Sequence, residues 1–239
     1  MININNSISR YNYDVKMFNF REIFEKHFSL ITNSKLEYIH ETLPQHYLPK
    51  EKVTLKNDQS LSIYEFMYSI DPGYNLKKSI NECQPGEFFK VYKKFIDHLC
   101  KSIFNEDLIY QARPTLRCHF VGNLAVGEFH RDREYNHPIE EINIWLPVTE
   151  ANSSNSIQIE TSINSNRFKS IDLNYGEFIL FDSGLMHGNK LNDTGKTRLS
   201  FDFRVIPKSM YSENSSTKNS VTQTIPMKIG SYYSVTNNF

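Results

Sequence analysis

The sequence predicts an α+β fold in which N-terminal helices brace an antiparallel β-core. Up to about residue 110, apolar residues recur at intervals of three and four, which is the spacing of one helix face. From about Gln111 the period changes to two, and clusters of Gly, Asn, Asp and Ser separate short apolar runs. Many short strands of this kind are typical of an antiparallel sandwich or barrel. Helices followed by a block of strands indicate helices packed on a β-core.

The clearest helix is predicted to begin at Pro85, because proline suits the first turn of a helix. Weaker patterns predict helices over residues 20–31 and 60–70, and the second of these ends at the turn signal Asp71-Pro72-Gly73. We expect the apolar face of the helix that begins at Pro85 to pack into the core. This face consists of Phe88, Val91, Tyr92, Phe95, Leu99, Ile103 and Phe104.

Alternation of side chains predicts the strands. One runs through residues 113–120, and another covers residues 141–147, where Ile142, Ile144 and Leu146 share a face. Further strands are predicted over residues 156–160, 167–173, 177–181 and 198–205.

We therefore expect one compact domain with three parts. Residues 1–110 are mainly helical, residues 111–207 form the β-core, and residues 208–239 form a C-terminal segment. The beginning of that segment is rich in Ser, Thr and Asn up to about residue 224, whereas residues 225–233 are apolar and aromatic. Such an apolar segment is expected to fold back onto the domain rather than lie in solvent.

The bulk composition disfavours several classes of protein. Lys and Arg total 27 and Asp and Glu total 27, so the chain lacks the basic excess of a nucleic-acid-binding protein. No apolar run approaches the ~20 residues that cross a bilayer, and the N-terminus lacks the pattern of a signal peptide. Three scattered cysteines are too few for a disulfide framework. We expect a cytoplasmic protein whose partner is a small molecule rather than nucleic acid or membrane. The sequence leaves open whether the protein forms a homodimer.

A candidate metal site begins with His130 and Asp132. On a strand, positions i and i+2 point to the same face, so both side chains reach one ion. Two imidazoles and a carboxylate suit Fe(II), although other divalent transition metals bind such ligands too. The His-x-Asp pattern is weak by itself, because chance produces it often. His187 strengthens it, since it follows a predicted strand and offers the second imidazole.

A candidate anion site follows on the strand over residues 198–205. Its alternation places Arg198, Ser200 and Asp202 on one face and Leu199, Phe201 and Phe203 on the other. If Arg198 points inward, its guanidinium needs an anionic partner, and Ser200 supplies a second donor. An exposed charge on the strand is the alternative for Arg198.

At these residues the chain resembles the Fe(II)/2-oxoglutarate-dependent dioxygenase superfamily. Residues 114–132, 141–147 and 229–233 are similar, more narrowly, to dioxygenase-like proteins of the streptomycin-biosynthesis type. The resemblance covers roughly residues 110–206 and implies a double-stranded β-helix, the jelly-roll or cupin-like core. It also implies that His130, Asp132 and His187 bind the metal, and that Arg198, with Ser200 beside it, holds 2-oxoglutarate.

The resemblance implies hydroxylation of a small polar metabolite, such as an amino acid, an amino sugar or a sugar nucleotide, in a biosynthetic pathway. The cofactor is Fe(II), and 2-oxoglutarate and dioxygen are cosubstrates. Related halogenases replace the aspartate by a small residue, so Asp132 favours oxygen insertion. Two alternatives stay open: a cupin-like metalloenzyme without 2-oxoglutarate, which has no use for a buried Arg198, and a non-catalytic small-molecule-binding jelly roll, which predicts degraded ligands.

The substrate contacts are predicted from two strand faces. Arg117 and His119 share a face with Arg113 and Thr115, and if that face lines the pocket it favours a substrate with a carboxylate or phosphate. A solvated outer face is the alternative. Asn143 and Trp145 share another face and offer a hydrogen bond and an aromatic wall, although a tryptophan in this position also suits the core.

Overall fold

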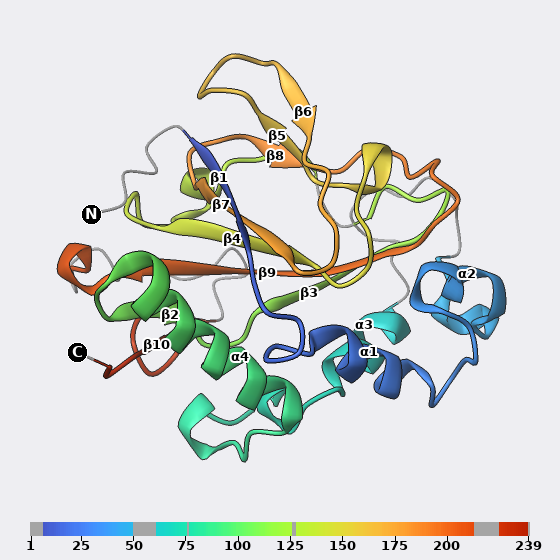
Figure 1. Cartoon of the computed structure of the whole chain (residues 1–239), viewed down its shortest axis with the longest axis horizontal. Helices are drawn as coiled ribbons and strands as arrows, with labels where there is room; N and C mark the ends of the chain where they lie inside the picture. Colours follow the sequence, from blue (N-terminus) through green and yellow to red (C-terminus); the bar gives the residue numbers. More distant parts are fainter. Residues whose placement is uncertain (1–6, 50–60, 76, 126–127, 213–224, 239) are drawn as a thin grey trace.

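The computed structural model describes residues 7–49, 61–75, 77–125, 128–212 and 225–238, and all statements on structure refer to these residues (Figure 1). Helices occupy the first part of the chain, as the 3.6-residue period predicts. They are α1 (Phe20–Phe28), α2 (Ile39–Thr42), α3 (Leu61–Tyr68) and α4 (Glu87–Leu99). Helix α4 begins two residues after Pro85 and continues as a π-helical turn, Cys100–Phe104, which ends at Asn105 in the left-handed conformation.

Two antiparallel sheets form the β-part of the molecule. The larger sheet has the order β1-β7-β4-β9-β2-β10, with β3 also paired to β9, and the smaller has the order β6-β5-β8. The strands are β1 (Ile8–Asn12), β2 (Leu108–Gln111), β3 (Thr115–His119), β4 (Ile142–Pro147), β5 (Gln158–Glu160), β6 (Phe168–Ser170), β7 (Glu177–Asp182), β8 (His187–Gly188), β9 (Arg198–Pro207) and β10 (Tyr233–Val235).

The two outermost strands of the larger sheet differ from the sequence prediction. Strand β1, in a region predicted mainly as helix, pairs with β7, and β10 near the C-terminus pairs with β2. Edge strands carry a weak alternation because only one neighbour and one face constrain them. The C-terminal segment is further attached through Tyr233, whose hydroxyl donates a hydrogen bond to the buried Glu141 carboxylate.

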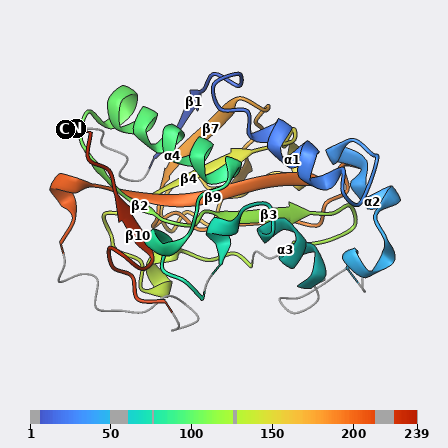
Figure 2. The same ribbon diagram turned by 90° about the horizontal axis from the view of Figure 1, so that it is seen from below.

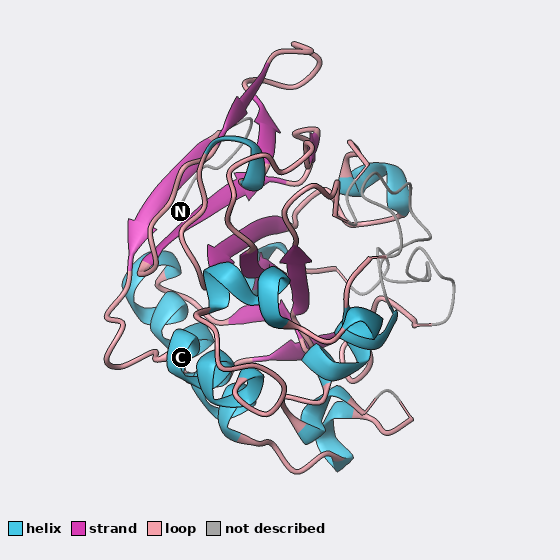
Figure 3. Cartoon of the chain, turned by 90° about the vertical axis from the view of Figure 1, so that its right-hand side faces the viewer, coloured by secondary structure: helices cyan, strands magenta, loops and turns pink. Residues whose placement is uncertain are grey.

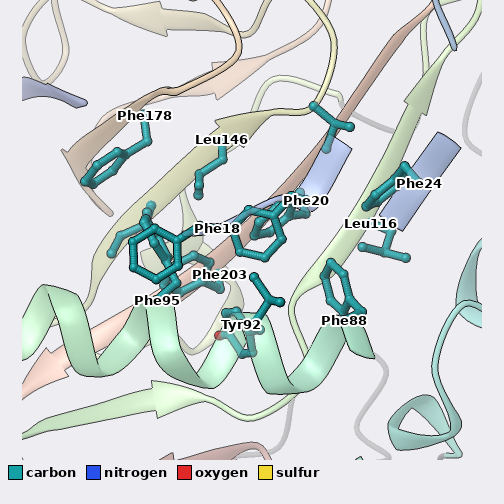
Figure 4. Packing of buried hydrophobic residues seen from close by; sticks show 14 of the residues in the cluster. Phe18, Phe20, Phe24, Phe88, Tyr92, Phe95, Leu116, Leu146, Phe178 and Phe203 are labelled. Atoms are coloured by element: carbon teal, nitrogen blue, oxygen red, sulfur yellow. The ribbon is translucent and has the colours of Figure 1, made fainter. Parts of the chain in front are cut away.

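Helices cover one face of the larger sheet (Figures 1 and 2). Between them lies an aromatic core in which Phe20 contacts Phe201 at 4.8 Å between ring centroids and Tyr92 contacts Phe203 at 5.1 Å. Figure 4 shows Phe88, Tyr92 and Phe95 pointing from α4 toward the strands. Because side chains alternate along β9, its apolar residues enter this core and its polar residues project from the opposite face.

The smaller sheet lies on the other side of the larger one, and a second apolar cluster fills the space between them (Figure 3). Trp145 of β4, Ile159 of β5 and Phe181 of β7 belong to this cluster. The polar face of β9 therefore points into the interior between the two sheets, and this arrangement positions the candidate site.

Among the described helices, none combines the length and the apolar character needed to span a bilayer.

Candidate metal centre

His130, Asp132 and His187 converge, with ligand atoms all within 4.8 Å of one another. His130 Nε2 lies 3.4 Å from Asp132 Oδ1, and His187 Nε2 lies 3.9 Å from the same oxygen. The structure thus brings together the three predicted ligands, although His187 lies 57 positions beyond His130 in the sequence.

The local backbone differs from the predicted strand. Asp132 begins a 3₁₀ helix, Asp132–Tyr135, and only a single β-bridge joins His130 to His187. Arg131 between the two ligands is extended (φ −110°, ψ 134°), so the side chains on either side of it still point the same way. At Gly188 an added Cβ would come within 3.0 Å of the Phe129 backbone, so glycine permits the close approach of this segment to β8.

Backbone carbonyls orient both imidazoles. His130 Nδ1 donates to the carbonyl of Glu128 at 2.7 Å, and His187 Nδ1 donates to the carbonyl of Leu185 at 3.1 Å. When Nδ1 donates in this way, Nε2 of each ring lies toward Asp132 and is available to bind a metal. Hydrogen bonds of this kind fix the orientation of histidine ligands in metal sites.

These residues fit a divalent transition metal. Adjacent donors at ~2.1 Å from an octahedral ion lie about 3 Å apart, close to the separations seen here. Burial lowers the pKa of His187 to about 4, which keeps the ring neutral and able to bind metal. Burial alone would raise the pKa of Asp132, but Arg204 and His130 hold the carboxyl well below its usual range.

Arg204 was not identified from the sequence. Its Nη2 lies 3.3 Å from Asp132 Oδ2, and its Nη1 lies 2.8 Å from Asp202 Oδ2. Arg204 continues the alternation of Arg198, Ser200 and Asp202 on β9, and this continuation was the signal that could have indicated it.

Arg198 points inward and is 1% exposed. Its guanidinium donates to the Asn155 carbonyl, to Ser200 Oγ at 2.7 Å and to Asn189 Oδ1 at 2.8 Å. In the part of the chain that the structure describes, no carboxylate forms an ion pair with it, and burial lowers its pKa to about 10. A buried guanidinium with only neutral partners favours an added anion.

The remaining predicted contacts divide into two groups. Asn143 and Trp145 line the cavity at the metal centre. The side-chain nitrogen and oxygen of Asn143 are buried there without a hydrogen-bond partner among the described residues. The guanidinium carbon of Arg198 lies 5.7 Å from the centroid of the Trp145 ring. Arg117 also lines it, but an ion pair at 2.7 Å with Asp202 neutralises its charge.

His119 does not line the cavity. It is fully buried behind Arg198, its Nε2 donates to the Asn123 carbonyl at 2.7 Å, and its Nδ1 accepts from Arg198 at 3.4 Å. The sequence left open whether this face of the strand points inward or to solvent; the structure turns His119 inward, but the end of β3 lies deeper than the cavity. His119 therefore supports Arg198 instead of facing a substrate.

The fold and the site define a helix-braced antiparallel β-protein with a buried candidate centre of two histidines and one aspartate. No protein-family model matches the chain. It is 37% identical over 145 residues to the streptomycin biosynthesis protein StrG of Streptomyces griseus, and the match covers 60% of this chain and 67% of that protein. The chain belongs to the family of StrG.

Two solved structures share the fold. AviO1 from Streptomyces viridochromogenes Tue57 matches with a TM-score of 0.52 at 10% identity, over 87% of this chain and 93% of that one. HygX from Streptomyces hygroscopicus, with nickel and 2-oxoglutarate bound, matches with a TM-score of 0.50 at 11% identity, over 87% and 85%. Further solved structures match over only 54% to 57% of their own length.

Proposed function

We propose that the protein is an Fe(II)- and 2-oxoglutarate-dependent oxygenase with a double-stranded β-helix core, which hydroxylates a small polar metabolite in a biosynthetic pathway. One observation carries the proposal. His130 and His187, which converge with Asp132, line the same cavity as Arg198, a buried guanidinium that has no acidic partner among the described residues. The binding of nickel and 2-oxoglutarate by HygX and the biosynthetic role in the name of StrG support it.

Each residue of the site has a role in this proposal. His130, Asp132 and His187 hold the iron, and their fixed orientation leaves the opposite side of the ion open. Arg198 and Ser200 bind the distal carboxylate of 2-oxoglutarate through charge-assisted hydrogen bonds. The unpaired amide of Asn143 lies on the wall of the same cavity and is free to bond a ligand oxygen. Trp145 and Phe181 limit the access of water.

When bound, iron, 2-oxoglutarate and dioxygen supply an oxidation in which one oxygen atom enters succinate, carbon dioxide leaves and the other oxygen atom enters a substrate C–H bond. The chain's own contribution is to bind, to orient and to exclude water. The neutral His187 and the ionised Asp132 are in the protonation states that this binding needs. Burial opposes a charge on His130, but the hydrogen bond with Asp132 raises its pKa, so a metal that binds there displaces a proton. The small-molecule substrate is the proposed partner.

The test measures binding and turnover separately. Fe(II) and 2-oxoglutarate are titrated anaerobically while the visible charge-transfer absorbance is recorded, and succinate is then quantified after oxygen is admitted. We expect His187→Ala to abolish the absorbance and Arg198→Met to weaken 2-oxoglutarate binding. The exposed residues His46 and Arg167 provide the matched controls His46→Ala and Arg167→Met.

Two results would contradict the proposal. Succinate formation that survives His187→Ala would exclude this metal centre. Metal binding without 2-oxoglutarate binding would favour a cupin-like metalloenzyme that uses no 2-oxoglutarate.

A further inference from the structure

The carboxylate of Glu160 lies between the two segments that carry the candidate metal ligands. Glu160 ends β5, which pairs with β8 so that Ile159 is opposite His187. Because neighbouring side chains on a strand point to opposite faces, Ile159 enters the core between the sheets and Glu160 points away from it. Glu160 is nevertheless fully buried. A buried carboxylate needs partners, and those of Glu160 come from both segments.

The first segment that Glu160 contacts contains His130 and Asp132. Between these two residues lies Arg131, whose extended backbone sends its side chain to the side opposite the ligands. Arg131 Nη2 donates to Glu160 Oε2 at 3.1 Å, and the Arg131 side chain is mostly buried. This ion pair therefore holds the backbone between the two ligands from the side away from their ligand atoms.

The second segment leads into His187. The backbone amide of Met186, the residue before His187, donates to the same Glu160 Oε2 at 3.2 Å. The Glu160 amide donates to the Met186 carbonyl at 2.8 Å, and Glu160 Oε1 accepts from the Asn166 amide at 2.9 Å, which orients the carboxylate. A single carboxylate oxygen thus joins the segment of Arg131 to the segment of His187.

The backbone contact between the two segments is short. His130 and His187 form an isolated β-bridge, in which each amide donates to the carbonyl of the other residue, at 3.0 Å and 2.9 Å. Two hydrogen bonds without a longer ladder open more readily than those within a sheet, unless other contacts hold the segments together. The ionised Glu160 carboxylate provides such contacts, because charge-assisted hydrogen bonds are stronger than those between neutral groups.

We propose that Glu160 is a positioning residue of the metal centre, and that it fixes the separation of His187 from the His130–Asp132 pair through Arg131 and the Met186 amide. It acts on the ligands without touching the metal. The donor atoms of a transition-metal site must be held to within a fraction of an ångström, so a shift of either segment weakens binding. This assignment rests on the proposed metal centre.

The first measurement is a titration of the full-length protein with Co(II) under anaerobic conditions, because its visible d–d absorbance reports both affinity and coordination geometry. Glu160→Gln keeps the size of the side chain and removes its charge. We expect it to weaken Co(II) binding about tenfold or more and to change the shape of the spectrum. Arg131→Met should act in the same way, and Arg131→Lys, which can still pair with Glu160, should restore part of the affinity.

Glu134→Gln is the matched control. Glu134 also pairs with Arg131, at 3.3 Å, but its side chain is exposed. An exposed ion pair contributes little, so we expect the Co(II) affinity of this variant to stay within about twofold of the wild type.

The second measurement is hydrogen exchange before cobalt is added, which tests the contact between the segments directly. The amides of His130 and His187 should exchange about tenfold faster or more in Glu160→Gln than in the wild type. The amides of β4 should keep their wild-type rates. Equal acceleration in β4 would show that Glu160 only stabilises the whole fold, and would overturn the proposal.

The remaining outcomes are equally decisive. Wild-type Co(II) affinity and spectra in both Glu160→Gln and Arg131→Met would overturn the proposal, as would exchange at His130 and His187 no faster than in Glu134→Gln. Absence of Co(II) binding to the wild type would instead contradict the proposed metal centre, and the exchange rates then decide whether Glu160 holds the segments together. If Glu160→Gln does not fold, Arg131→Met and Arg131→Lys decide by the same two measurements.

Discussion

At the scale of single residues, the site is a chain of paired charges. Arg117 pairs with Asp202, Asp202 with Arg204, and Arg204 with Asp132. Each of these groups is buried or partly buried, where an unpaired charge is costly. Arg198 is the exception, because its described partners are neutral. Carboxylates of the protein neutralise Arg204, whereas the described partners of Arg198 do not neutralise it. This contrast supports the proposed roles, in which Arg204 positions Asp132 and Arg198 binds the cosubstrate.

Removal of the Arg204 charge tests its positioning role. In Arg204→Met the Asp132 carboxylate loses the hydrogen bonds from the guanidinium that orient it, so we expect metal affinity to fall about 10–100-fold, as for other residues that orient metal ligands. Calorimetric titration with Ni(II) measures this, and Arg204→Lys should restore part of the affinity. An affinity equal to that of the Arg167→Met control would contradict the role of Arg204.

The buried His119 predicts a dependence of stability on pH. Burial and the nearby Arg198 lower its pKa to about 3 in the native protein, whereas an unfolded histidine titrates near ~6.5. Between these values the unfolded chain binds the extra proton, so the native state loses about 1.4 kcal/mol per pH unit as pH falls. Urea denaturation of the metal-free protein at several pH values between 4 and 6.5 gives the free energy of unfolding as a function of pH. Its slope against pH should be smaller in His119→Gln than in the wild type by about that amount. An equal slope in His119→Gln and the exposed-site control His46→Gln would refute this.

At the scale of elements, β9 organises the molecule because its two faces have different chemistry. Its apolar residues pack against α4 and α1, and its polar residues build the interior site. The period of two was visible in the sequence, and the structure confirms the predicted separation of Arg198 and Ser200 from Leu199 and Phe201. The strand extends two residues further than predicted, to Pro207, and the extension includes no new site residue.

Helix α4 stabilises the sheet from the other side. Phe95 is fully buried and contacts the rings of Phe18 at 5.2 Å and Phe178 at 5.3 Å. We expect Phe95→Ala to destabilise the protein by about 3–5 kcal/mol, because it leaves a cavity in an aromatic core. The exposed neighbour variant Lys94→Ala should stay within about 0.5 kcal/mol of the wild type. Chemical denaturation measures both, and equal effects would show that α4 packs differently.

At the scale of the whole molecule, the site joins distant parts of the chain. Of the candidate metal ligands, His130 lies in a loop, Asp132 begins a 3₁₀ helix and His187 belongs to β8. Arg198 and Arg204 come from β9. A second cavity is lined by residues of α3 and of the C-terminal segment. A ligand that bridges these parts binds the native state and not the unfolded one, so it must stabilise the fold.

Metal and cosubstrate should therefore raise the melting temperature. At a concentration 100 times the dissociation constant the gain is about 2.7 kcal/mol, which corresponds to about 5–10 °C for a chain of this size. Thermal melts with Ni(II) and 2-oxoglutarate should show this increase, and chelation should reverse it. His187→Ala should show no increase, and an increase in that variant equal to the wild type would mean that the metal binds elsewhere.

Several elements of the fold and site could be predicted from the sequence, each for a local reason. The helices α1, α3 and α4 follow from apolar spacing, and the five site residues His130, Asp132, His187, Arg198 and Ser200 follow from motif spacing and alternation together with the family resemblance. Strand β1 could not be predicted, because an edge strand has few apolar residues to reveal its period. The position of His119 beyond the end of the cavity could not be predicted either. Alternation gives the face of a strand on which a residue lies, but not its distance along the strand from a cavity.

By itself the sequence determined the periodicity of the elements, the candidate metal-binding side chains and the balance of charge. The periodicity and the His130-Asp132 pair depend on residues a few positions apart, which the backbone geometry of helices and strands relates directly. His187, 57 positions beyond His130, was joined to them by its place after a predicted strand and by the family resemblance. The tertiary structure decided that Arg204 contacts Asp132 from 72 positions away, that the Asn143 amide is unpaired and that Tyr232 lines a cavity together with Tyr68 and Tyr74. Such contacts depend on how sheets and helices pack over the whole chain, and no local pattern specifies that packing.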